Sequence, residues 1–149
     1  MDIFDIIKED HEKVRDLIEK MIEESAPEKR NRSRNMSTLK DLILPHIYAE
    51  ENLFYPVIME ETDGKDLVLE ALEEHRAAKG VLSDVEAAEK DDDQFRANLQ
   101  VLDDLLEHHI DEEEGEIFDK AEEVIDGDRA DEMGVRFQEI KKQSKVEAR

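Results

Sequence analysis

Apolar residues recur every three or four positions along almost the whole chain, which is the period of an amphipathic helix. No stretch alternates apolar and polar residues for long enough to form a half-buried strand. The breaks in the pattern predict five helices, at about 2–24, 25–61, 65–90, 94–125 and 129–143. The turn and capping signals between them are Ser25–Glu28, Asp63–Gly64, Asp91–Asp93 and Asp126–Gly127.

Short connections make consecutive helices antiparallel neighbours. The pattern therefore predicts an all-α fold, an up-down antiparallel four-helix bundle with an additional C-terminal helix. We divide the chain into a metal-binding bundle at 1–126 and an amphipathic helix and tail at 127–149. The last helix has an apolar edge of Met133, Phe137 and Ile140. Because so short a helix is marginal alone, we expect it to dock on the bundle or to form a homodimer with a second copy.

Two of the predicted helices carry a histidine and, four residues later, a glutamate within an apolar run. This spacing puts both side chains on one helix face, about 6 Å apart along the axis, so that they can converge on one ion. The other two long helices each carry a single histidine on the apolar stripe. In an antiparallel bundle all six residues fall within about two helical turns of one another. These predicted metal ligands are His11, His46, Glu50, His75, His109 and Glu113.

A carboxylate on a core-facing stripe costs several kcal/mol unless it is paired or coordinated. Two such carboxylates occur here beside four imidazoles, with no core-facing arginine as a partner. Metal ions would remove the cost. The chain has no cysteine, so every ligand atom is nitrogen or oxygen, which suits iron or manganese, with zinc next.

Several polar neighbours are expected to lie outside this site. His108 shares its helix stripe with Asp104, which places it on the solvent side or behind a ligand. The glutamate pattern of ferritin-like di-iron proteins and the His-Glu-x-x-His motif of zinc proteases are both missing. We expect Glu51, Glu112 and Glu114 to face water, and Tyr48 and Tyr55 to point away from the His46 stripe and not to be ligands.

The formal charge of −22 argues against nucleic acid or an anionic membrane as a partner, because binding phosphate needs a clustered positive face. The first residues are too acidic, and their apolar run too short, for a signal peptide. No stretch approaches the roughly 20 apolar residues of a membrane span. We therefore expect a cytoplasmic protein.

The chain resembles the hemerythrin-like proteins, or HHE cation-binding domains, over about residues 2–125. The matching pieces are Asp10–His11, His46 with Glu50–Glu51 and Leu53–Phe54, Glu74–His75, and His109 with Glu113–Glu114 and Ile117–Phe118. The resemblance implies a non-haem centre of two Fe ions, bridged by the two glutamates and by an oxo or hydroxo group, with the four histidines as terminal ligands. Zinc or manganese could substitute for the iron.

Function is implied by the same resemblance. It favours a protein that binds oxygen or nitric oxide as a carrier, scavenger or sensor. Oxygen-carrying members have a further histidine one turn after the third-helix histidine, where this chain has Lys79. That departure motivates the alternative of an enzyme that reduces peroxide or nitric oxide, or of a protein that repairs or donates iron to iron centres. A third interpretation treats the histidines as polar core residues of a scaffold.

Overall fold

The structure is a computed structural model that describes residues 1–24 and 29–147. Those residues are helical almost throughout and contain no strand. In chain order the elements are α1 (Ile3–Glu23), α2 (Lys29–Ala49), η1 (Glu50–Phe54), α3 (Tyr55–Glu61), α4 (Lys65–Ala87), α5 (Asp92–Glu112), η2 (Glu113–Ile117), α6 (Phe118–Glu122) and α7 (Gly127–Glu147).

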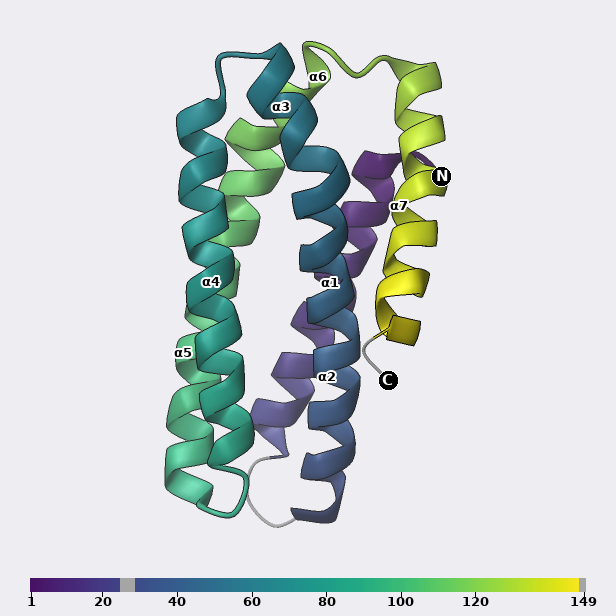
Figure 1. The fold of residues 1–149 in the computed structure, drawn as a ribbon. Coiled ribbons are helices and arrows are strands. Elements are labelled where there is room, and N and C mark those ends of the chain that lie inside the picture. The colour runs from purple at the N-terminus through teal and green to yellow at the C-terminus, as the bar shows by residue number, and fades with distance from the viewer. Residues whose placement is uncertain (25–28, 148–149) are drawn as a thin grey trace.

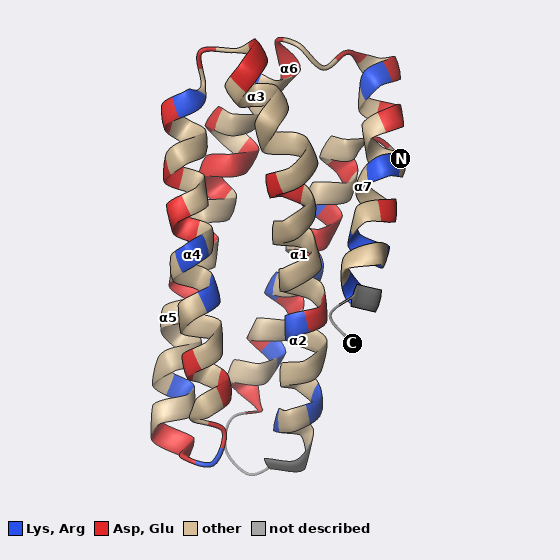
Figure 2. Ribbon diagram, viewed as in Figure 1, with Lys and Arg blue, Asp and Glu red and all other residues tan. Residues whose placement is uncertain are grey.

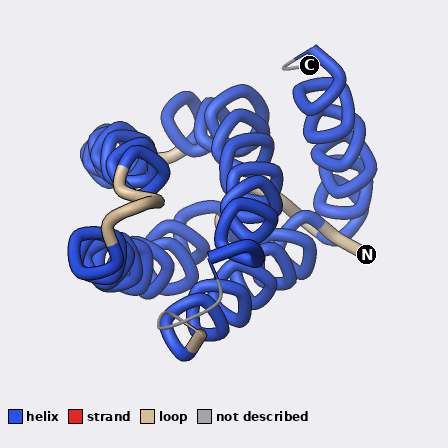
Figure 3. The backbone as a smooth tube through the Cα atoms, turned by 90° about the horizontal axis from the view of Figure 1, so that it is seen from below, coloured by secondary structure: helices blue, strands red, loops and turns tan. Residues whose placement is uncertain are grey.

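The elements assemble into the predicted up-down bundle (Figure 1). α2, η1 and α3 follow one another without a break, as do α5, η2 and α6, so each trio acts as one long helix. These two long helices form the bundle together with α1 and α4. The four run alternately up and down along the molecule. α7 lies outside the four and packs against α1 and α2, as Figure 3 shows from below. The all-α prediction is therefore confirmed for the described residues.

Aspartates cap the start of three helices, of which the sequence predicted the cap at Asp91. The side chains of Asp2, Asp91 and Asp126 each accept a hydrogen bond from the backbone N–H three residues later, at 2.9, 3.2 and 2.9 Å. Such caps satisfy donors that the first turn leaves free. The capping box predicted at 25–28 lies outside the described residues. Gly127 was expected to end the fourth helix, but it is the first residue of α7.

The buried apolar side chains form two separate clusters. The first apolar cluster lies at the end of the bundle that holds α3 and α6, and it includes Ile3, Ile7, Phe54, Ile58, Ile117, Phe118 and Phe137. The second apolar cluster fills the opposite half and includes Ile18, Met36, Leu39, Leu82, Phe95, Leu99 and Leu102. On every bundle helix, the predicted metal ligands lie where the residues of one cluster give way to those of the other. We call these six residues the ligand layer.

The π-helical segments η1 and η2 each begin at a buried glutamate of the ligand layer, Glu50 and Glu113. A π turn holds one more residue than an α turn, so it shifts the later residues of a stripe by one position. At α-helical spacing the stripe of His46 and Glu50 would continue through Leu53 and Val57. These two residues are only partly buried, and the fully buried residues there are Phe54 and Ile58.

The apolar edge of α7 faces the bundle of the same chain. Met133 and Phe137 are buried, and Ile140 is partly buried, against the first apolar cluster. Docking on the bundle, one of the two predicted arrangements, is therefore what the structure contains. A homodimer through this helix, and the division of the chain at residue 126, stay predictions.

Charge is distributed rather than concentrated. Figure 2 shows acidic residues spread over the helices, with basic residues interspersed among them. This distribution is unlike the clustered positive face that phosphate binding needs. Within the described residues, none of the helices has an apolar stretch long enough to cross a lipid bilayer.

Candidate metal centre

The structure brings all six predicted ligands together in the middle of the bundle. Each long helix contributes the part of its stripe that lies between the two apolar clusters. The side chains are almost completely withdrawn from solvent, because none of the six residues is more than 7 % exposed and both glutamates are 0 % exposed.

The ligand layer contains two overlapping groups of potential ligands. His11 and His46 form the first group with Glu50 and Glu113, and His75 and His109 form the second with the same two glutamates. Within each group, one nitrogen or oxygen atom from every residue lies within 4.8 Å of the others. Two ion positions that share two carboxylates are the arrangement expected of a carboxylate-bridged pair.

Ring nitrogens and carboxylate oxygens converge closely on these positions. In the first group, His11 Nε2 lies 3.0 Å from Glu113 Oε1, and His46 Nε2 lies 3.3 Å from Glu50 Oε1. In the second group, the Nε2 atoms of His75 and His109 lie 3.1 Å from each other. The same two nitrogens lie 3.2 Å from Glu50 Oε1 and 3.5 Å from Glu113 Oε2, respectively.

Unsatisfied polar atoms test whether metal ions fit this site. Four buried side-chain nitrogen or oxygen atoms among the described residues make no hydrogen bond. Three of them belong to the ligand layer: His46 Nε2, Glu50 Oε2 and Glu113 Oε1. Such atoms are costly in a protein interior. A cation between them would coordinate all three, so the residues present fit metal ions.

A second carboxylate stands behind each ligand histidine. The Nδ1 atoms of His11, His46, His75 and His109 lie 2.6, 2.8, 2.8 and 2.7 Å from carboxylate oxygens of Glu114, Asp10, Glu51 and Glu74, respectively. With the proton on Nδ1, each histidine directs the lone pair of Nε2 at the ion positions. Such partners fix the tautomer and make the imidazole a stronger ligand.

These partners correct one prediction. Glu51 and Glu114 were expected to face water, but both are partly buried and contact a ligand histidine. Each of these two residues directly follows a glutamate of the ligand layer. The π segment begins at that preceding glutamate and changes the direction in which the side chain of Glu51 or Glu114 points. Beyond the paired Glu-Glu motif, nothing in the sequence signals these contacts.

Charges in the layer are strongly coupled. Burial by itself would lower the pKa of His46, but carboxylates at both of its ring nitrogens raise it to about 10. The pKa of His109 is raised to about 10 for the same reason. Burial would raise the pKa of Glu113, but its polar neighbours hold it well below its ordinary value. Protons on the histidines thus balance the buried carboxylates, and metal ions can replace them.

A family comparison now bears on this geometry. The family model described as the hemerythrin HHE cation binding domain matches residues 2–121. The chain belongs to this hemerythrin family. Membership implies that the domain binds metal ions, in agreement with the donor set of the ligand layer. The comparisons with curated proteins and with solved structures found no match.

The hemerythrin-family bundle also contains residues near the site that were expected elsewhere. Tyr55 was predicted to point away from the ligand layer, but it is 1 % exposed, and its hydroxyl donates a short hydrogen bond to Glu113 Oε2. An uninterrupted α-helix would turn Tyr55 to the side opposite His46, because nine residues at about 100° each make two and a half turns. The extra residue in η1 turns the tyrosine inward.

His108 behaves as predicted. Its side chain is 65 % exposed, and its Nε2 lies 3.1 Å from Glu112 and 3.6 Å from Glu74. It therefore stands on the solvent side of Glu74, the carboxylate that contacts His109. Glu112 is only partly exposed, which departs from the expectation that it faces water. Lys79, where the resemblance to the oxygen carriers led us to look for a further histidine, is exposed.

α7 reaches the ligand layer although it lies beyond the residues matched by the family model. Lys141 Nζ contacts both carboxylate oxygens of Asp10, at 2.9 and 2.7 Å, and Asp10 in turn contacts His46. The ring of Phe137 packs edge-on against the His46 ring, with 5.6 Å between centroids. The C-terminal helix therefore contacts His46, one of the predicted ligands, and covers its ring.

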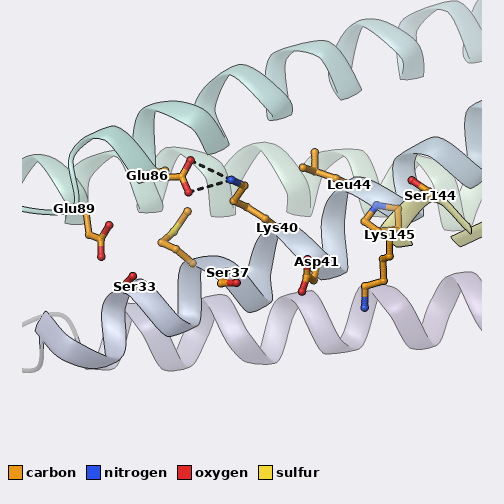
Figure 4. Close-up of a pocket in the computed structure, with 11 residues that line it drawn as sticks. Ser33, Ser37, Lys40, Asp41, Leu44, Glu86, Glu89, Ser144 and Lys145 are labelled. Atoms are coloured by element: carbon orange, nitrogen blue, oxygen red, sulfur yellow. Dashed lines mark hydrogen bonds and ion pairs between the residues drawn. The ribbon is translucent and has the colours of Figure 1, made fainter. Parts of the chain in front are cut away.

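The space beside the ligands is small. A cavity of about 30 Å³ is bounded by the four ligand histidines, Asp10 and Glu50, and by the apolar side chains of Val14, Ile43, Leu106 and Ile110. A wider surface hollow of about 440 Å³ lies along α2, where Lys40 reaches across to Glu86 (Figure 4). None of the predicted ligands lines that hollow.

Proposed function

We propose that this chain is a non-haem di-iron protein that binds oxygen or nitric oxide as a carrier, scavenger or sensor. The observation that carries the proposal is the pair of four-residue groups that share Glu50 and Glu113. When bound, two iron ions would supply the electrons that a diatomic ligand takes up. The rest of the site consists of this chain's own side chains.

The roles of the six predicted ligands follow from the geometry of the ligand layer. His11 and His46 would hold one ion, His75 and His109 the other, and the two glutamates would bridge them. All donors are nitrogen or oxygen atoms. Such donors suit iron or manganese better than metal ions that prefer thiolate ligands. Zinc fits the same donors and serves as a redox-silent probe.

The size and lining of the cavity support a small ligand. A cavity needs roughly 10–15 Å³ of accessible volume to hold one water molecule. Five of the six predicted ligands line the cavity of about 30 Å³, so bound ions would take up part of it and leave room only for a small ligand beside them. Its apolar wall, which includes Val14 and Leu106, favours an uncharged ligand.

A second candidate function is supported by the exposed side chain of Lys79. Because this position supplies no ligand, each ion would have two histidines and the two shared glutamates, which leaves positions open for a reacting molecule. An enzyme that reduces peroxide or nitric oxide, or an iron donor for damaged iron centres, would use such openness. Catalytic turnover of peroxide by the iron-loaded protein would favour the enzyme, whereas stoichiometric binding without turnover would favour the carrier.

Iron content and a visible spectrum test the proposal. The protein is reconstituted anaerobically with ferrous iron, and the spectrum is recorded before and after oxygen or nitric oxide is added. We expect about two irons per chain and a new absorption band. His46→Ala should lose iron, whereas the matched control His108→Ala, which removes the exposed fifth histidine, should keep it. Equal iron content in the two variants, or no iron in the wild type, would overturn the proposal in favour of a scaffold.

A further inference from the structure

We propose that Tyr55 is a seventh protein ligand of the metal centre, bound through its phenolate oxygen to the ion position between His75 and His109. This inference rests on the proposed di-iron function and adds a ligand to it. It concerns a residue that the sequence pattern placed on the far side of the helix.

The position of the hydroxyl is that of a ligand atom. Tyr55 Oη lies 3.2 Å from His75 Nε2 and 3.5 Å from Glu50 Oε1, and it contacts Glu113 Oε2 directly. Donors that bind one ion at right angles, each at about 2.1 Å, are about 3 Å apart. The ring nitrogens of His75 and His109 are 3.1 Å apart, so the phenol oxygen shows the same spacing as the histidine donors.

The surroundings of the ring hold the oxygen in this place. The Tyr55 ring stacks on the His75 ring, with 5.3 Å between centroids and 25° between planes, and it also packs beside Phe54. The side chain is 1 % exposed, so its hydroxyl has no alternative partner in solvent. Three of the residues near the hydroxyl are predicted ligands, and a tyrosine that only filled the core would not need to aim its oxygen at all three.

Coordination by Tyr55 would add one more donor to the ion position between His75 and His109. The second ion position has two histidines of its own and shares both glutamates, and the exposed Lys79 offers it no donor. A phenolate is a hard anionic oxygen donor of the kind that ferric iron favours. On binding, the phenol O–H bond breaks, an oxygen–metal bond forms, the proton leaves to solvent, and no electron is transferred. Because phenolate stabilises the ferric state, this ligand favours a scavenger over a reversible carrier.

The chain offers a matched pair for the test, because Tyr48 is its only other tyrosine and is 46 % exposed. The wild type, Tyr55→Phe and Tyr48→Phe are loaded with iron, oxidised and compared. We expect a phenolate-to-iron charge-transfer band, with enhanced tyrosine ring vibrations in the resonance Raman spectrum, in the wild type and in Tyr48→Phe. Tyr55→Phe should lose the band and the vibrations while its iron content stays near two per chain.

The outcomes separate this inference from the proposed function. Two irons per chain without a phenolate band in the wild type, or with a band that survives in Tyr55→Phe, would reduce Tyr55 to a hydrogen-bond donor. No iron in the wild type would overturn both proposals.

A second measurement does not depend on the folding of Tyr55→Phe. Protein labelled with ¹³C at the tyrosine Cζ gives two signals, which Tyr48→Phe assigns. Zinc should shift the Tyr55 signal toward that of a phenolate, and an unmoved signal in zinc-loaded protein would overturn the ligand assignment.

Discussion

Lys141→Met tests whether α7 is part of the metal centre. The lysine is only 18 % exposed and contacts both oxygens of Asp10, whose carboxylate is 9 % exposed and contacts His46. Methionine keeps most of the aliphatic volume beside Phe137 but removes the charge. The substitution therefore leaves Asp10 with His46 as its remaining partner.

The magnitude follows from the burial of the pair. Removing one partner of a fully buried ion pair costs about 3–5 kcal/mol. Lys141 is partly exposed, and solvent screening reduces this to about 2 kcal/mol in the free energy of unfolding. Loss of a partner behind a metal ligand costs about 10- to 100-fold in metal affinity. Lys141 acts through Asp10, one contact further from the metal, so we expect the low end, about tenfold.

Urea unfolding of the metal-free protein measures the first effect, and zinc titration against a competing chelator measures the second. Lys142→Met is the matched control, because Lys142 is the exposed neighbour on the same helix. If Lys141→Met matches Lys142→Met in both unfolding free energy and zinc affinity, then α7 does not support His46, and the reasoning is refuted.

Two further predictions concern protonation and backbone packing. In the metal-free protein, the free energy of unfolding should fall as pH rises from about 6.5 to about 10, because His46 and His109 have pKa values of about 10 when folded and the native state binds more protons over that range. Metal-loaded protein should instead lose metal and stability as pH falls, because protons compete with the ions for the same ring nitrogens; urea titrations that show the same slope for both forms would contradict this. Gly134→Ala should lower the melting temperature, because its Cβ would lie 2.5 Å from the carbonyl oxygen of Met1. Gly80→Ala, with nothing within 4 Å, should stabilise by about 1 kcal/mol, and melting shifts of the same sign in the two variants would refute the packing argument.

The four-helix fold and the convergence of the six predicted ligands could be read from the sequence. His46 and Glu50, four residues apart, must share a helix face, and short turns fix the depth of each helix in the bundle. These constraints come from helix geometry, so they tolerate errors of a few residues at the helix ends.

The surroundings of the site could not be predicted in the same way. Tyr55 and Glu51 depend on the π segment η1, whose extra residue rotates everything that follows, and the pattern of apolar residues does not reveal a π turn in advance. The link from Lys141 to Asp10 depends on how α7 rotates against α1, which is decided by packing between helices distant in sequence.

The ligand layer also has a consequence for how the molecule comes apart. It separates the two apolar clusters, each of which draws side chains from all four bundle helices. Regions with separate cores can open as independent cooperative units, each with its own free energy of opening. Ions bound by all four helices would fasten the two halves together. Amide hydrogen exchange should therefore show two opening free energies without metal and one with it, and a single value in both forms would argue against this division. Bound iron would then stabilise the fold in addition to supplying the chemistry of the site.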